Sequence, residues 1–278
     1  MGLRVNTNVF SLTAQRNLSN VSGRLQGNFE RLSSGLRIAR AADDAAGLAI
    51  SERLRAQVRS LDQAGRNAQD GVSLVQTAEG ATSEVTSNLT RLRELAVQAS
   101  NGTLNTGDRA ALNEEFQALT TEIERVANQT TFNGINILDG SQSSSGIDIQ
   151  VGTESGEVIN VGVNDLNISA LGLVSGSVSF DVTTVSLASA AIDTIDAAID
   201  TVTSFRGDLG AIQNRLESAA RSISSTSENL SAAESRIRDL DIAKETANLT
   251  KNSILQQAAV SVLAQANTQP QLALSLLG

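Results

Sequence analysis

A heptad stripe of large aliphatic side chains runs through residues 195–237. Its members recur at a strict interval of seven: Ile195, Val202, Leu209, Leu216, Ile223, Leu230 and Ile237. The companion positions, three residues further on, hold mostly small residues such as Ala198 and Ala219. This alternation is typical of helices that pack as a coiled coil. At 1.5 Å per residue the stripe predicts a helix of roughly 60 Å, which needs a second long helix as its partner.

The same period recurs nearer the N-terminus, where residues 45–100 predict that second long helix. Its apolar positions fall at three-, four- and seven-residue spacings and include Leu54, Leu61, Ala68, Val75, Val85, Leu89, Leu92 and Ala96. A further helix is expected over about residues 106–127, with Thr106 as its N-cap. Because the chain reverses between the two heptad regions, we expect the long helices to run antiparallel.

Between the helices the period changes to strict alternation. Apolar residues at 147, 149 and 151, and again at 159, 161 and 163, flank the turn sequence "GTESGE" and predict a β-hairpin. The stretch "GSVSFDVTTVS" is a candidate for one more strand. The predicted fold class is mainly α: a long antiparallel coiled-coil rod with a small β-hairpin region, and further helices at both termini.

Both chain ends are amphipathic helices that the rod leaves without a partner. The N-terminal face comprises Leu18, Val21, Leu25, Phe29 and Leu32, and the C-terminal face comprises Leu255, Ala259, Val262 and Ala266. We expect these faces to be buried against neighbouring copies, which makes the chain a filament subunit. The alternative is a small coiled coil of the two ends within one copy.

These patterns divide the chain into four segments. Residues 1–42 form an N-terminal terminal-helix segment, and residues 43–187 the first part of the rod with two helices and the hairpin. Residues 188–238 form the C-terminal rod helix, and residues 239–278 a C-terminal terminal-helix segment.

Composition narrows the chemistry. The chain has no Cys and no His, and its only aromatic residues are six Phe. Thiolate and imidazole chemistry are therefore absent, and we predict no catalytic, cofactor-binding or metal-binding residues and no enzymatic activity. A net charge of −9 argues against nucleic-acid binding. No apolar run is long enough to predict membrane insertion, and the N-terminus does not have the pattern of a signal peptide.

The charge is distributed unevenly. Residues 1–60 carry nine Arg and four acidic residues, whereas no Lys or Arg occurs between Arg125 and Arg206. Two interpretations stay open: a solvated acidic surface, or self-assembly in which copies meet through opposite charges.

Several stretches resemble the terminal regions of bacterial flagellins. They are "VNTNVFSLTAQRNL", "LSSGLRIARAADDAAGLAISERLRAQVRSL", "ANQTTFNGINILDG", "DLGAIQNRLESA" and "NSILQQAAVSVLAQANTQPQLALSLL". The resemblance covers about residues 1–140 and 188–278, in the family's order. Residues 141–187 alone separate the two parts, so the family's large variable outer domains have no counterpart here.

The resemblance implies a subunit of the flagellar filament, the propeller for swimming motility, which is exported unfolded through the flagellar type III channel and is therefore secreted and extracellular. It implies that the terminal helices pair in an inner tube. The implied partners are further copies of the chain, an export chaperone at the C-terminal helix, and the filament cap and hook–filament junction proteins. The alternatives are a hook–filament junction protein of the same superfamily and, in a different class, a monomeric binding protein.

By the same resemblance, "LTRLRELAVQ" and "LNEEFQAL" are similar to the segments that host Toll-like receptor 5 recognises. Arg91, Leu95 and Glu115 fall on matching positions. Their ordinary structural interpretation, a solvated Arg and Glu on helices and a packed Leu, stays open beside the receptor contact.

Overall fold

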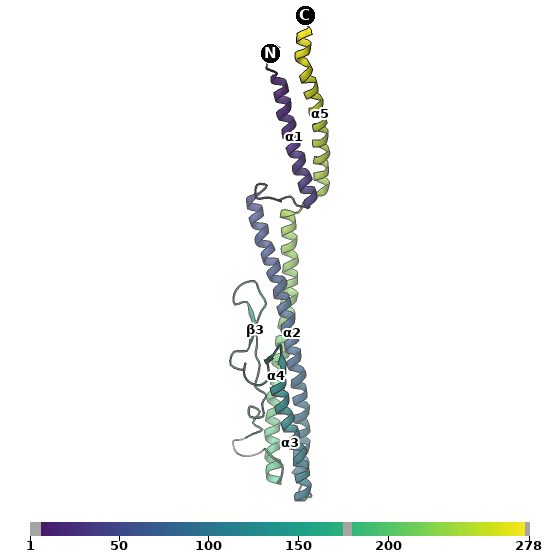
Figure 1. Cartoon of the computed structure of the whole chain (residues 1–278). Coiled ribbons are helices and arrows are strands. Elements are labelled where there is room, and N and C mark those ends of the chain that lie inside the picture. The colour runs from purple at the N-terminus through teal and green to yellow at the C-terminus, as the bar shows by residue number, and fades with distance from the viewer. Residues whose placement is uncertain (1–6, 175–179, 276–278) are drawn as a thin grey trace. The chain divides into compact units, whose positions relative to one another are not determined.

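The computed structural model describes residues 7–174 and 180–275 of the chain, with side chains to residue 269. It divides into two compact units, which we call the terminal unit (residues 1–56 and 229–278) and the central unit (residues 57–228). The elements, in chain order, are α1 (Val9–Ser34), α2 (Ala45–Ala99), α3 (Thr106–Gln129), β1 (Thr131–Phe132), β2 (Ile135–Asn136), β3 (Ile147–Gln150), β4 (Val158–Val161), α4 (Val185–Arg238) and α5 (Ile242–Ser275) (Figure 1). The expected mainly α fold with an antiparallel hairpin is confirmed.

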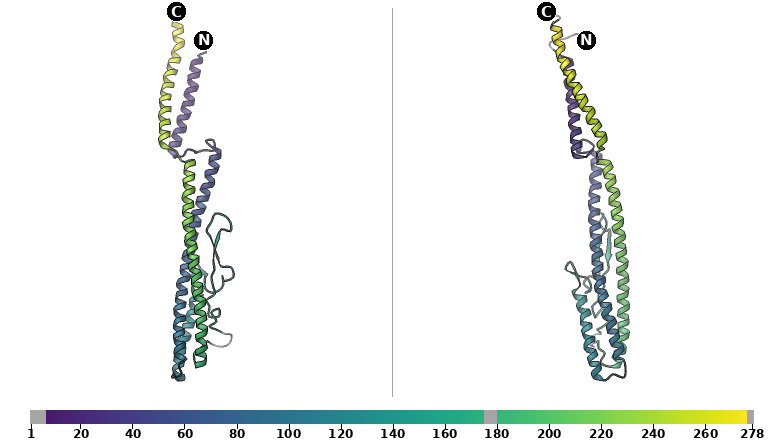
Figure 2. Two further views of the ribbon diagram at one scale, coloured as in Figure 1. Left: turned by 180° about the vertical axis from the view of Figure 1, so that it is seen from behind. Right: turned by 90° about the vertical axis from the view of Figure 1, so that its right-hand side faces the viewer.

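In the central unit α2 and α4 run antiparallel, side by side in all views (Figures 1 and 2). Near one end Ser227 of α4 donates to Asp62 of α2 at 3.1 Å. Further along, a methyl group placed on Gly71 would lie 3.2 Å from Leu216, so the helices approach closely there. A later residue of α2 therefore contacts an earlier residue of α4, as expected for antiparallel helices.

The core of the central unit lies between these two helices, α3 and the β region. Phe116 of α3 and Phe205 of α4 are at most 1% exposed, and Ile159 and Val161 of β4 are also buried. The rings of Phe116 and Phe180 lie 5.1 Å apart and tilted. The small β region thus completes a helical core.

The turn between α2 and α3 corrects one detail of the sequence analysis. The N-cap of α3 is Asn105, whose side chain accepts from the Asp108 backbone at 2.9 Å while Asp108 accepts from the Asn105 backbone at 3.1 Å. Thr106 is the first helical residue, because this reciprocal capping box satisfies two N–H groups at once. The buried Arg109 donates to the carbonyls of Ala99 and Asn101, both at 2.9 Å, and so caps the end of α2.

The β region consists of two hairpins. The predicted one pairs β3 with β4, Ile147 opposite Val161 and Gln150 opposite Val158. The sequence analysis missed the short pair of β1 and β2, which is closed by Asn133 and Gly134. Both of these residues have positive φ, as a tight hairpin turn requires.

The additional strand expected at residues 176–186 is not formed by its described part. Residues 176–179 lie outside the described residues, and residues 180–184 adopt no regular strand. Here the side chain of Val182 is buried in the core, and its backbone N–H donates to the Asn113 side chain at 3.1 Å. An irregular segment held in this way needs no strand partner.

In the terminal unit α1 and α5 lie side by side and antiparallel (Figure 2). α1 ends at Gly35, whose φ of 69° gives the left-handed cap that glycine favours. The segments that follow α1 and precede α5 are joined by backbone bonds: Arg37 donates to Arg238 at 2.7 Å and Leu240 to Gly35 at 3.0 Å. The two chain ends thus pair within one copy, which is the alternative arrangement weighed for them above.

Candidate assembly surfaces

The contact between α1 and α5 is lined by polar side chains along much of its length, and we call it the polar seam. Near one end Asn8 donates to the Ala266 carbonyl and the Ser11 hydroxyl to the Asn267 side chain, each at 2.7 Å. Hydrogen bonds of this kind fix register and spacing, but they bury less apolar area than a leucine seam would.

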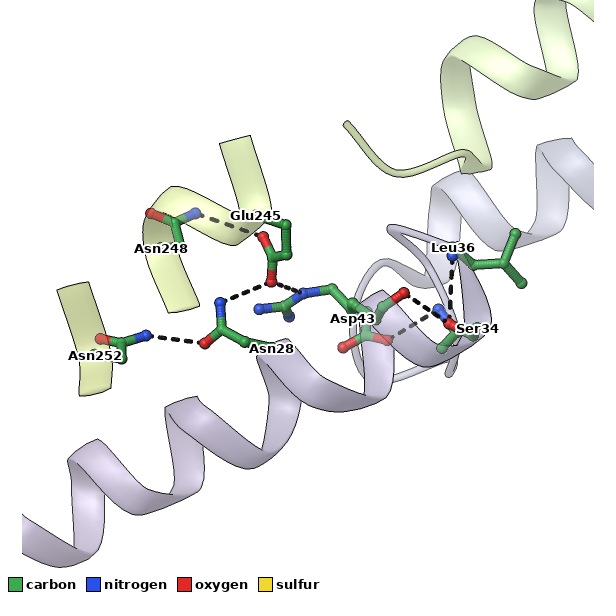
Figure 3. Close-up of polar contacts among 9 residues, drawn as sticks. Asn28, Ser34, Leu36, Asp43, Glu245, Asn248 and Asn252 are labelled. Carbon is green, nitrogen blue, oxygen red and sulfur yellow. Dashed lines mark hydrogen bonds and ion pairs between the residues drawn. The ribbon is translucent and has the colours of Figure 1, made fainter. Parts of the chain in front are cut away.

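A buried carboxylate organises the other end of the polar seam (Figure 3). One oxygen of Glu245 accepts from Asn28 Nδ2 and from Arg31 Nε, both at 2.8 Å. Asn252 in turn donates to Asn28 Oδ1 at 2.9 Å. Glu245 is 7% exposed and Asn28 2%. A charge buried this deeply is stable only when it is paired, so this network sets which residues of α1 and α5 face each other.

The faces predicted on the terminal helices are only partly covered by this pairing. On α1 one of the five residues is exposed (Phe29), and the other four are half-buried: Leu18, Val21, Leu25 and Leu32. On α5 the predicted series is split. Ala259 is half-buried and Ala266 buried, whereas Leu255 and Val262 are 39% and 59% exposed.

Large apolar side chains are exposed on both terminal helices: Val9, Phe10, Leu12, Phe29, Ile242, Ile254, Leu255, Val260 and Val262. On α5 the apolar residues are spread around the helix, and no charged residue follows Lys251. Exposed apolar patches commonly mark association sites. The exposed apolar side chains of α5 are therefore a candidate surface for association with another molecule.

The heptad stripe of α4 shows a gradient of burial. Its first five members are buried: Ile195, Val202, Leu209, Leu216 and Ile223. Leu230 and Ile237, which belong to the terminal unit, are half-buried. The side chains that hold α4 in the core are thus concentrated in the central unit.

The three residues matched to receptor contacts are split between surface and core. Arg91 Nη1 lies 2.9 Å from Glu94, and Arg91 Nε donates to Glu115 at 2.9 Å. These hydrogen bonds, that to Glu94 first, raise the pKa of Arg91 above its usual value. Leu95 is 1% exposed and packs in the core. Arg91 and Glu115 are therefore an exposed, mutually paired patch, whereas Leu95 is a core residue.

Charge is divided between the units. The terminal unit holds twelve basic and eight acidic residues, a net charge of +4, and the central unit holds nine Arg and 22 acidic residues, a net charge of −13. Among the described residues no three Asp or Glu side chains are placed to hold a metal ion. No described helix is long and apolar enough to cross a bilayer.

Comparison with protein families places these features in context. The chain matches the bacterial flagellin N-terminal helical region over residues 5–143 and the bacterial flagellin C-terminal helical region over residues 192–277. The chain belongs to the bacterial flagellin family. The two matches include α1, α2, α3 and α5 and all of α4 except its first seven residues, and the segment between the matches contains β3 and β4.

Named relatives agree over their whole lengths. The chain is 50% identical over 273 residues to a flagellin of Halalkalibacterium halodurans, covering 98% of this chain and 99% of the relative. It is 45% identical over 303 residues to a flagellin of Bacillus subtilis, covering 99% and 100%. A flagellar filament 30.7 kDa core protein of Treponema maltophilum is 43% identical over 282 residues, covering 98% and 99%.

Solved structures give the same result. The crystal structure of Bacillus cereus flagellin matches with a TM-score of 0.50 and 32% identity, covering 61% of this chain and 94% of that one. A putative flagellar hook-associated protein from Vibrio parahaemolyticus matches with a TM-score of 0.58 but only 16% identity, covering 71% and 100%. This second likeness shows a shared fold alone.

As a member of this family, the chain is a structural protein of the extracellular flagellar filament. Its functional surfaces are accordingly those through which copies pack together.

Proposed function

We propose that the terminal helix pair is the part of this flagellin that drives its polymerisation. The observation that carries the proposal is the surface of α5 beyond Lys251, which holds no charged residue and where Ile254, Leu255 and Val262 are exposed. Full burial of such a side chain contributes about 1.5–3 kcal/mol, so a few of them on each copy are enough to favour association. The polar seam holds α1 and α5 in register, and the exposed apolar residues meet neighbouring copies.

The central unit has the complementary role in this proposal. Its apolar stripe is already buried between its own helices, so it is stable without neighbours and supplies a rigid body to the filament. In this proposal the chain acts through packing contacts between side chains, and no catalytic step is assigned to it.

We extend the proposal to the further partners that the resemblance to flagellins implies. Before assembly, the apolar residues of α5 need cover, which an export chaperone at this helix provides while the chain awaits unfolded passage through the type III channel. The filament cap and the hook–filament junction proteins meet the same terminal helices at the two ends of the filament. Where a host is present, Toll-like receptor 5 contacts the exposed pair of Arg91 and Glu115, with Leu95 fixing the position of the helix.

The test places a charge on the exposed face of α5. Ile254→Asp combined with Val262→Asp should leave the monomer folded, because these side chains are 61% and 59% exposed, and should abolish seeded filament growth seen by electron microscopy. The matched control is Gln257→Asp, also exposed on α5, which introduces the same residue type at a polar position. Filaments of normal length from the double variant would remove α5 from the assembly surface.

A further inference from the structure

Asparagine is followed directly by glycine at two places in the chain, Asn101–Gly102 and Asn133–Gly134. The first pair lies in the turn between α2 and α3, and the second closes the hairpin of β1 and β2. All four residues are exposed. Asparagine in this position is chemically labile, because glycine has no side chain to shield the backbone nitrogen that follows the asparagine.

The labile reaction is deamidation through a cyclic imide. The backbone nitrogen of the glycine forms a bond to Cγ of the asparagine, and the side-chain nitrogen leaves as ammonia with the proton of the glycine N–H. Water then opens the succinimide ring at either carbonyl and leaves aspartate or isoaspartate. The rate therefore rises when a neighbouring group makes the glycine N–H more acidic, or stabilises the negative charge that develops on the side-chain oxygen.

The turn at Asn101 stabilises the developing charge on that oxygen. Asn101 Oδ1 accepts from the Thr103 backbone N–H at 3.1 Å, which is an Asx turn that folds the side chain over the intervening Gly102 peptide. The Thr103 N–H is therefore already directed at the atom that becomes negative. The side-chain nitrogen of Asn101, which has to leave, is hydrogen-bonded to no described residue.

Arg109 acts on the peptide bond between Asn101 and Gly102. Its Nη2 donates to the Asn101 carbonyl at 2.9 Å, and the Leu104 backbone N–H donates to the same oxygen at 3.3 Å. This carbonyl is conjugated with the Gly102 nitrogen, so a positive charge at the oxygen withdraws electrons from the nitrogen and makes its proton more acidic. Because Arg109 is only 9% exposed, water screens its charge little.

The product of the reaction also suits this turn. Arg109 donates to two backbone carbonyls but makes no ion pair with any described residue. A carboxylate at position 101 would lie beside this cation, and their attraction offsets the repulsion from the carboxyl end of α2. An aspartate there keeps the acceptor for the Thr103 N–H, whereas isoaspartate lengthens the backbone by one carbon and changes the turn.

The second Asn–Gly pair has none of these donors. Asn133 and Gly134 both have positive φ and are held between the paired residues Phe132 and Ile135. No side chain of the described ranges donates to either Asn133 or Gly134. The chain thus contains the same dipeptide with and without a polarising environment.

We propose that Asn101 is a site of spontaneous deamidation, and that Thr103 and Arg109 accelerate the reaction in the folded chain. Each copy that reacts gains one negative charge at the turn between α2 and α3, so older copies carry more negative charge there. The reaction consumes only water, and it is independent of the proposed polymerisation.

The test compares the two asparagines within one preparation of the full-length chain. The protein is kept at mildly alkaline pH, either folded or unfolded in guanidinium chloride. Mass spectrometry follows the tryptic peptide 94–109 for Asn101, and the peptide 125–154, released by cleavage after Glu, for Asn133. A donor placed at a developing oxyanion changes rates by about 10²–10³ in enzymes, so we expect Asn101 to react about tenfold faster than Asn133 when folded.

The unfolded chain supplies the reference rate. Both asparagines should react at similar rates there, because both precede glycine and neither keeps its folded surroundings. Asn101 should react faster in the folded chain than in the unfolded chain, whereas Asn133 should react more slowly when folded. If Asn101 reacted no faster in the folded chain than in the unfolded chain, the turn would not activate it and the proposal would be overturned.

Substitutions at Arg109 test the contribution of the cation. Arg109→Met should slow the reaction of Asn101 several-fold and leave that of Asn133 unchanged, and Arg109→Lys, which keeps a positive charge, should retain part of the acceleration. Equal rates at Asn101 in both variants and the unmodified chain would overturn the role of Arg109. If hydrogen exchange of α3 showed that Arg109→Met opens the turn, the folded and unfolded rates of the unmodified chain would still decide the proposal.

A matched control tests the chemical route. Gly102→Ala adds a methyl group that meets no atom within 4 Å, and Gly102 is not among the glycines with positive φ, so the turn should be kept. The methyl group shields the attacking nitrogen, and conversion of Asn101 should fall by about tenfold while Asn133 is unaffected. Conversion of Asn101 at the unmodified rate in this variant would exclude the cyclic imide and overturn the proposed mechanism.

Discussion

Arg93 of α2 and Asp196 of α4 hold each other at two points, with Nε to Oδ1 at 2.6 Å and Nη2 to Oδ2 at 3.2 Å. The two residues lie far apart in the chain, and the planar guanidinium matches the carboxylate geometry. This pair therefore links the two longest helices on the exposed side of the central unit.

Acid should weaken this link. The hydrogen bond from Arg93 lowers the pKa of Asp196 below its usual value, and the charge of Arg93 adds to that effect. A lowered folded-state pKa gives stability that is present above the unfolded-state pKa of about 3.9 and is lost as pH falls through the folded-state pKa. Asp196→Asn should therefore flatten the acid limb of a stability-against-pH curve measured by denaturant unfolding. The effect is small because the pair is exposed, and an unchanged acid limb would show that the pair adds nothing in solution.

Helix-interior glycines should fall into two classes. A methyl group on Gly80 of α2 would meet nothing within 4 Å, so Gly80→Ala should stabilise the central unit by about 0.5–1 kcal/mol. A methyl group on Gly47 would lie 2.8 Å from Ile38, which is 1% exposed, and closer still to Asp44. Gly47→Ala should therefore destabilise the start of α2. Hydrogen exchange of the two segments reads out both variants, and equal effects of the same sign would contradict the assignment.

The spacing of hydrophobic residues along the sequence predicted the buried side chains of the central unit well and those of the α1–α5 pair less well. This difference has a physical reason. In α4 the core side chains are aliphatic, so their seven-residue spacing marks the buried face directly. In the polar seam the deeply buried residues are Glu245 and Asn28, which a search for apolar periodicity passes over. The face predicted on α5 therefore includes both the buried Ala266 and the exposed Val262.

Two local features, the N-cap of α3 and the short hairpin of β1 and β2, were not predicted correctly from the sequence. Thr106 and Asn105 are both acceptable caps, and only the reciprocal bond with Asp108 decides between them. The sequence Asn133–Gly134 is a strong signal for a two-residue hairpin turn and would have located β1 and β2. The partner of each long helix was predictable from chain reversal, whereas the network around Glu245 depends on contacts between opposite ends of the chain.

The network around Glu245 should be sensitive to loss of its cation. Arg31→Met removes one of the two strong donors to the buried carboxylate, and should destabilise the α1–α5 pair by about 1–3 kcal/mol, measured by hydrogen exchange of both helices. The double variant Arg31→Met with Glu245→Met removes both charges and should recover much of that loss, since an unpaired buried charge is the main penalty. Equal losses in the single and double variants would show that the ion pair does not set the stability of the seam.

The heptad stripe of α4 should contribute unequally along its length. Leu216 is fully buried and lies against Gly71 of α2, so Leu216→Ala should cost about 2–5 kcal/mol through lost burial and the cavity it leaves. Leu230 is half-buried, so the same truncation there removes less contact and should cost clearly less. Denaturant unfolding followed by far-UV circular dichroism measures both variants on the same monomer. If Leu230→Ala proved as costly as Leu216→Ala, Leu230 would contribute as much to stability as the fully buried members of the stripe. The stabilising part of the stripe would then not be confined to the central unit.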